Sequence, residues 1–493
     1  MEDASPHRPR IDWVDAAKAW GMFLVFYGHF VEGVAQTDNH AAFVQQKLVY
    51  SFHVPLFVLL SGFLARSAGD QPRLWPFLKR QAASRLLPVL FFSVLMVPFF
   101  PLQEALQDYL PSESGLVRAG WIGGEMCRRL TPPAEGDQSR SRRKLWGSLP
   151  APVQSTVKEI AADRKVDDSG PEAIAVALNQ ALARPDLFAL TDFDGVPVSG
   201  RDRQWLAADR SAVPEKKLRA RNADLMWKAL FPEDAGGGDS GWLWRVNNYW
   251  RGFPDLAVPT WFLVGLFTLE LFHFLVGRVL TNRIRLVLAI PLFFGVGWLL
   301  NMNVDKPWSD IWFARESVFL YAFYLLGLLL RETAFLERGG GWWSSWPLVV
   351  AGSGVVWYTF DLNPGSRFFA PVVLINMSQH GSLLYFTITA LAGCLAVVGL
   401  ARLVPRLRVL SFTGRHSLIL MGLNSFFFWF VNHNLTNHLD LPPSPVTVLL
   451  SCIAVTLISL GLCAPVVWLL DRYLPQLVGR PRVQGPLLPR LVR

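Results

Sequence analysis

The sequence predicts an all-α polytopic membrane bundle of about ten transmembrane helices, with one large insertion after the third helix. Three observations lead to this fold class. Hydrophobic residues make up 52% of the 493 residues and charged residues only 17%, a balance far from that of a soluble globular domain. Apolar runs of about 18 or more residues, long enough to cross a bilayer, recur along the chain. Basic residues crowd alternate loops between these runs, which is typical of a multi-pass protein.

The expected spans form two blocks separated by the insertion. Residues 1–104 hold the first three spans, residues 256–471 hold the other seven, and residues 472–493 form a tail. Residues 105–255 shift in composition to Pro, Asp, Arg, Ala and Gly with helical periodicity, which predicts a mainly α insertion. The ten spans are expected near residues 13–35, 46–65, 86–104, 256–277, 284–301, 313–330, 345–361, 382–401, 408–431 and 446–470.

The distribution of charge predicts how the chain is oriented in the membrane and which classes of partner it can bind. Residues 111–250 hold 20 basic and 19 acidic residues, so nearly all of the net charge of +9 lies in short loops around the spans. This pattern favours a lipid bilayer as partner and argues against nucleic acid. The positive-inside rule places both termini in the cytoplasm. Residues 105–255 are then expected to be periplasmic or otherwise extracytoplasmic.

Two ionisable side chains share one face of the first expected span. Lys18 and His29 stand eleven residues apart in IDWVDAAKAWGMFLVFYGHFVEGV. At about 100° per residue this spacing returns to nearly the same helical face, roughly 16 Å along the axis. Ionisable groups within a membrane are costly unless they face protein or a water-filled cavity. The spacing therefore predicts a polar stripe that faces the interior of the bundle.

A second histidine, His53, lies early in the next span, at a depth similar to that of His29. Pro55 beside it removes a backbone donor, so the helix is expected to bend there. Two imidazoles facing one cavity would suit general-base catalysis on a sugar hydroxyl, because imidazole titrates near neutral pH. The alternative interpretation is that both histidines only form hydrogen bonds between helices. No third ligand at helical spacing accompanies them, which argues against a metal site.

The loop after the second span is strongly basic and includes Lys79, Arg80 and Arg85. A solvated cytoplasmic loop is the simplest interpretation. Because Lys18 opens toward the same side, these residues could also bind the phosphates of a donor whose reactive end reaches His29. Further polar groups in later spans, equally compatible with structural pairing and with substrate contact, are Glu270, His273, Arg315 and Glu316.

At this point the motifs resemble a known family. The stretches RIDWVDAAKAWGMFLVFYGHF and FHVPLFVLLSGFLAR, followed later by WFLVGLF, YLLGLLLR and LSFTGRHSLIL, are similar to those of acyltransferase family 3, bacterial integral-membrane O-acyltransferases of carbohydrates. The fucose 4-O-acetylase-like branch is especially similar. The chain departs from the family pattern at Ala82, where the first Arg of the R-x-x-R pair is expected, and at Asn424, where a His is common. The insertion resembles nothing familiar.

The resemblance implies transfer of an acyl group, usually acetyl, from cytoplasmic acyl-CoA to a hydroxyl of an extracytoplasmic or lipid-linked glycan. Acyl-CoA would then be a co-substrate, and no cofactor is expected. His29 would be the general base or acyl-handling residue, Lys18 its basic partner, and His53 a residue of the same site. The implied location is the bacterial inner membrane. The nucleotide would bind near Lys79, Arg80 and Arg85.

A transporter of glycans or lipid-linked sugars is the alternative function, because it would use a similar polar cavity. Transporters tend to show related halves or helices interrupted at corresponding positions. Neither is visible in this sequence, and a transporter needs no cytoplasmic site for CoA. The sequence leaves the acceptor, the acyl chain, the route of transfer and homo-oligomer formation open.

Overall fold

The computed structural model describes most of the chain, and the described part is helical. It contains no strand, apart from an isolated bridge between Leu374 and Gln379. Two compact units are present: Met1–Val97, Arg251–Gly365 and Val372–Arg493 form the first, and Pro98–Trp250 with Ser366–Pro371 forms the second. The residues described are 11–35, 39–65, 73–99, 150–163, 177–178, 180–193, 200–230, 246–301, 310–334, 342–365, 372–404, 407–439 and 441–492.

The first unit is a bundle of helices drawn from both sides of the insertion. Short helices and π-helical turns join the long ones at several points. In chain order its α-helices are α1 Asp12–Ala35, α2 His40–Tyr50, α3 His53–Phe63, α4 Leu74–Gln81, α5 Leu87–Met96, α15 Trp261–Val276, α16 Arg283–Asn301, α17 Ala314–Glu332, α19 Trp342–Thr359, α20 Leu383–Leu403, α21 Arg408–Arg415, α22 Ser417–Phe426, α23 His433–His438 and α24 Pro445–Tyr473.

Seven helical segments of the described chain are long and apolar enough to cross a membrane, so the protein is a multi-pass membrane protein. They are His40–Phe63, Leu74–Phe99, Val246–Val276, Arg283–Asn301, Ile311–Glu332, Leu383–Leu403 and Pro445–Tyr473. The expected count of ten is not confirmed. The other three expected spans are helical but more polar or broken: α1 carries charged residues, α19 is rich in Ser, Gly and Trp, and the ninth span is divided into α21, α22 and α23.

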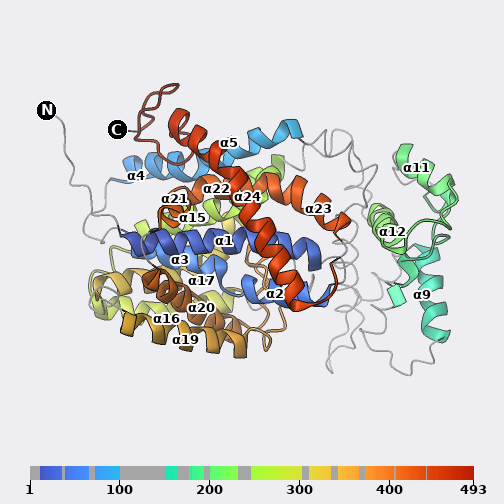
Figure 1. Ribbon diagram of the computed structural model, residues 1–493, viewed down its shortest axis with the longest axis horizontal. Coiled ribbons are helices and arrows are strands. Elements are labelled where there is room, and N and C mark those ends of the chain that lie inside the picture. The colour runs from blue at the N-terminus through green and yellow to red at the C-terminus, as the bar shows by residue number, and fades with distance from the viewer. Residues whose placement is uncertain are drawn as a thin grey trace. The chain divides into compact units, whose positions relative to one another are not determined.

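Helix α1 lies at the centre of the first unit. Figure 1 shows it in dark blue, running lengthwise through the bundle, with α24 in red crossing it. Fifteen of its 24 residues are buried, including Asp15. Such extensive burial explains how α1 can carry ionisable groups, since protein rather than lipid surrounds most of it. The helices packed against it are α2, α3, α20, α21, α22, α23 and α24.

The expected bend near Pro55 takes the form of a complete break. Helix α2 ends at Tyr50 and α3 begins at His53, with a turn at Ser51 and Phe52 between them. A proline ring clashes with the carbonyl four residues earlier and offers no N–H to it. For Pro55 that carbonyl belongs to Ser51, so the break falls where this clash requires it. His53 thereby becomes the first residue of α3.

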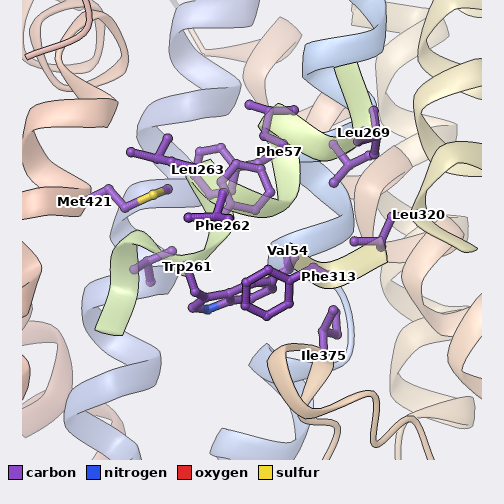
Figure 2. Packing of buried hydrophobic residues seen from close by; sticks show 14 of the residues in the cluster. Val54, Phe57, Trp261, Phe262, Leu263, Leu269, Phe313, Leu320, Ile375 and Met421 are labelled. Carbon is purple, nitrogen blue, oxygen red and sulfur yellow. The ribbon is translucent and has the colours of Figure 1, made fainter. Parts of the chain in front are cut away.

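The main hydrophobic core joins α3, α15 and α17. Figure 2 shows the rings of Trp261 and Phe313 lying together beside Val54, with centroids 5.1 Å apart for the two rings. Phe57 and Phe262 form a second aromatic contact at 5.9 Å. The core therefore holds α3 in place from Val54 onward, and Val54 directly follows His53.

Two glycines allow α3 and α17 to approach very closely. A Cβ added at Gly62 would overlap the carbonyl of Tyr324, and one added at Gly327 would overlap the carbonyl of Leu59. Small residues at such crossings let helix backbones meet, which is a common basis of helix association in membranes. The α3–α17 contact therefore requires glycine on both sides.

The second unit has its own hydrophobic core. Its described α-helices are α9 Ala151–Asp163, α11 Gly200–Ala207 and α12 Glu215–Leu230. Buried polar groups accompany the apolar core: Asp202 is paired with Arg221 at 3.0 Å, and Asn222 donates to the carbonyls of Leu182 and Arg184. This pattern is that of a folded helical module; its extracytoplasmic location stays a prediction.

Replacing Gly62 by alanine should destabilise the first unit. The added methyl group meets backbone that cannot rotate away, so the free energy of unfolding should fall by about 1–3 kcal/mol. Thermal unfolding of the purified protein in detergent measures the change. Gly461→Ala in α24 is the matched control, because a Cβ there meets nothing within 4 Å. Equal stability of the two variants would contradict the close α3–α17 contact.

Candidate active site

His29 belongs to a small hydrogen-bonded group with two residues that the sequence analysis did not select. Its Nδ1 lies 3.2 Å from the Tyr50 hydroxyl and 3.4 Å from Oε2 of Glu32. The Tyr50 hydroxyl donates to the same Glu32 oxygen at 2.7 Å. The His29 and Glu32 side chains are 16% and 22% exposed, so the group is partly accessible. Helix α1 supplies His29 and Glu32, while α2 supplies Tyr50.

These contacts are compatible with a neutral His29 ring that carries its proton on Nδ1. Because the Tyr50 hydroxyl donates its proton to Glu32, its oxygen is available to accept from Nδ1–H of His29. A neutral imidazole protonated at Nδ1 carries its lone pair on Nε2. Nε2 is therefore the nitrogen that can accept a proton from a substrate. A base oriented by a third group is the arrangement used in many nucleophilic enzymes.

His53 joins this group through Tyr50. Its ring lies 5.1 Å from the Tyr50 ring, and its Nδ1 is 2.9 Å from the carbonyl of Val49. This hydrogen bond is made possible by the break between α2 and α3, which places the His53 side chain against the end of α2. His53 is buried, and within the described residues no hydrogen bond joins it to His29. The structure thus brings the two histidines together around one tyrosine.

Lys18 lies on the predicted face of α1 but is separated from His29 by apolar side chains. It is partly exposed, whereas Met22 and Val25, on the same face between the two residues, are buried in the main hydrophobic core. The polar stripe expected from the sequence is therefore interrupted in this conformation. A ligand reaching from Lys18 to His29 would have to displace these side chains.

The segment 408–438 covers this face of α1 along its whole length. Near the start of α1, Arg415 lies 3.9 Å from Asp15; farther along, Phe427 packs on Phe26 at 5.6 Å. The contact continues with Phe428, whose ring lies 5.1 Å from that of His29. The two segments therefore run parallel and in register.

Two π-helical turns carry residues that bear on the predicted site. Phe427–Asn432 carries Phe428 against His29, and Ala82–Leu86 carries Arg85. π-Helical turns are rare and occur frequently at functional sites.

The basic residues predicted to bind the nucleotide do not form one cluster. Lys79 is exposed and lies over the Trp75 ring at 5.3 Å, and Arg80 beside it on α4 is partly exposed. Arg85 forms a bidentate ion pair with Glu270, at 2.8 and 3.2 Å. Arg85 is thus already paired, and its role toward a nucleotide stays a prediction.

The other polar residues noted in the sequence have partners of their own. His273 lies 2.9 Å from the Tyr321 hydroxyl through Nδ1. Nε2 of His380 lies 2.9 Å from Oε1 of Glu316, with both side chains almost fully buried. Arg315 lies near Asp310 instead of pairing with Glu316. These contacts fit structural links between helices.

Sequence reasoning could have found Glu32 but not Tyr50. Glu32 follows His29 by three residues, a spacing that makes helical neighbours. Tyr50 belongs to another helix, and nothing in its local pattern points to His29.

One comparison with known proteins gives a match. Residues 11–111 match the family model of the acyltransferase domain of acyltransferase family 3. The match supports a membrane acyltransferase. It includes Lys18, His29, His53 and the basic residues of α4 and the turn after it, and also Glu32 and Tyr50. It does not separate branches of the family, so the fucose 4-O-acetylase-like branch stays a prediction. No curated protein and no solved structure matches the chain.

Variants of the Arg85–Glu270 pair can separate a structural role of Arg85 from a role of Arg85 in donor binding. Arg85→Met leaves the buried Glu270 without its partner and should lower the free energy of unfolding by about 3 kcal/mol. The double variant Arg85→Met with Glu270→Met should regain most of that loss. Thermal unfolding measures both. A double variant that is as unstable as the single one would contradict the structural role. If Arg85 also binds the donor, the double variant regains stability without regaining acyl transfer.

Proposed function

We propose that this protein is an O-acyltransferase that moves an acyl group, usually acetyl, from cytoplasmic acyl-CoA to a hydroxyl of an extracytoplasmic or lipid-linked glycan. The observation that carries the proposal is the His29–Tyr50–Glu32 chain of hydrogen bonds on a buried helix within the segment that matches an acyltransferase domain. An oriented base is the central requirement of this chemistry, because a sugar hydroxyl must lose its proton to attack a thioester.

In the proposed reaction, Nε2 of His29 takes the proton from the acceptor hydroxyl as its oxygen attacks the carbonyl carbon of the thioester. The carbon–sulfur bond then breaks, CoA leaves as the thiolate, and the imidazolium returns the proton to the sulfur. Tyr50 and Glu32 hold the ring and stabilise the positive charge that develops on it. A route through an acyl group on His29 uses the same residues, and the two routes share the same requirement for Nε2.

The donor would enter from the cytoplasmic side and the acceptor from the opposite side. The positive-inside pattern supports cytoplasmic termini and a periplasmic insertion in a bacterial inner membrane. Lys18 lies nearer the end of α1 expected in the cytoplasm, where Lys79 and Arg80 would meet the nucleotide. The acyl end would then advance along α1 toward His29. This movement requires a change in packing, since Met22 and Val25 fill that face.

Replacing His29 by glutamine should abolish O-acylation of the cell-envelope glycan. Glutamine has a similar size but cannot act as a base near neutral pH. A deletion strain carrying either the native or the altered protein would be compared by mass spectrometry and NMR of its glycans, which also identifies the acyl group and acceptor. His40→Gln, at an exposed site, controls for expression. Normal acylation with His29→Gln, at equal protein levels, would overturn the proposal.

Tyr50→Phe should keep the fold but lower kcat by about 10- to 100-fold, because it removes the hydroxyl between His29 and Glu32. Initial rates with purified protein, acyl-CoA and acceptor measure this effect. Tyr27→Phe is the matched control: it removes a tyrosine hydroxyl that donates to Gln45 and has no contact with His29 among the described hydrogen bonds. Equal rates for the two variants would rule out a role of the Tyr50 hydroxyl in the reaction.

A further inference from the structure

Asn424 has a fully buried side-chain amide that is unpaired in the part of the chain that the structure describes. It lies in α22 and is 0% exposed. Among the described residues, neither its Nδ2 nor its Oδ1 has a hydrogen-bond partner. Buried polar groups in native proteins are nearly always paired, and an unpaired one calls for an explanation such as a ligand. An asparagine with both a donor and an acceptor unused is therefore a candidate binding group.

The packing of α22 on α1 places Asn424 between the two ends of the proposed donor path. Phe427 and Phe428, three and four residues after Asn424, contact Phe26 and His29 of α1. Residues at these spacings are neighbours on a helix surface, so Asn424 shares the face that meets α1. One helical turn corresponds to about 5 Å along the axis. Asn424 is thus about one turn from the His29 contact, toward the end of α1 that bears Lys18.

The same level of α1 is occupied by apolar side chains. Met22 is 0% exposed and belongs to the core that also contains Leu420 and Leu423 of α22. A polar amide in such surroundings is unfavourable unless a ligand arrives with matching groups. Asn424 lies just before the π-helical turn Phe427–Asn432, where the helix geometry departs from that of a regular α-helix.

We propose that Asn424 binds a secondary amide in the arm of the acyl donor as the thioester passes from Lys18 toward His29. This inference rests on the proposed function. The arm of CoA contains secondary amides, each with one N–H and one carbonyl. The N–H and C=O of a trans secondary amide point to opposite sides, so Asn424 would use one of its two atoms for each amide: Nδ2 would donate to the carbonyl of one amide, and Oδ1 would accept from the N–H of the other. A bare thioester carbonyl would satisfy only Nδ2.

Donors with and without an amide provide the test. S-acetyl-N-acetylcysteamine carries one secondary amide next to its thioester, and S-propyl thioacetate carries none. With Asn424→Leu, which keeps the volume and removes both hydrogen bonds, KM for the amide-bearing donor should rise by roughly tenfold. KM for S-propyl thioacetate should stay at the native value. Thr456→Val, which removes another buried unpaired hydroxyl from α24, should leave both values unchanged.

Stability gives a second, independent measurement. Removing an unpaired buried amide should raise the midpoint of thermal unfolding of the ligand-free protein. We therefore expect the Asn424→Leu variant to be more stable than the native protein and to have a higher KM for the amide-bearing donor. A lower midpoint would mean that Asn424 has a structural partner and would overturn the inference. An equal rise in KM for both donors would overturn it as well while leaving the acyltransferase intact. If the native protein used neither thioester nor acyl-CoA, the proposed function would fall together with this inference.

Discussion

The parallel contact between α1 and the segment 408–438 shapes the environment of the ionisable groups near both ends of α1. Asp15 meets Arg415 near one end, and His29 meets Phe428 near the other. Gly414 permits this approach, because a Cβ there would overlap the backbone of Asp15. A helix with ionisable residues on one face can be buried in a membrane only if protein covers that face. The segment 408–438 provides this cover.

This arrangement explains why the candidate site has two distinct parts. Around His29 the polar atoms are paired and partly accessible, as the proposed role of a base for an external acceptor would require. Between His29 and Lys18 the contact is apolar, with Met22 on one side and the unpaired amide of Asn424 on the other. In the proposed reaction, a closed contact would protect the thioester from hydrolysis when the acceptor is absent. Opening that contact would then be a step of the reaction cycle.

The polar pairs in other helices serve a different purpose. Arg85 with Glu270 joins the turn before α5 to α15, and His380 with Glu316 joins the segment before α20 to α17. Isolated charges at these positions would be costly in a membrane, whereas pairs fix the relative positions of helices. The bundle that supports α1 is thus held by small-residue contacts and by a few buried polar links.

The sequence by itself determined the helical membrane class, the apolar segments, the bend near Pro55 and the shared face of Lys18 and His29. Each follows from local composition or periodicity, because helix length and face are set by neighbouring residues. Tertiary structure alone decided that Tyr50 links Glu32 to His29, that Arg85 is paired with Glu270, and that Met22 interrupts the polar stripe. These contacts join helices whose register depends on packing between distant segments. A local pattern records which face of a helix is buried, but not which residue of another helix it meets.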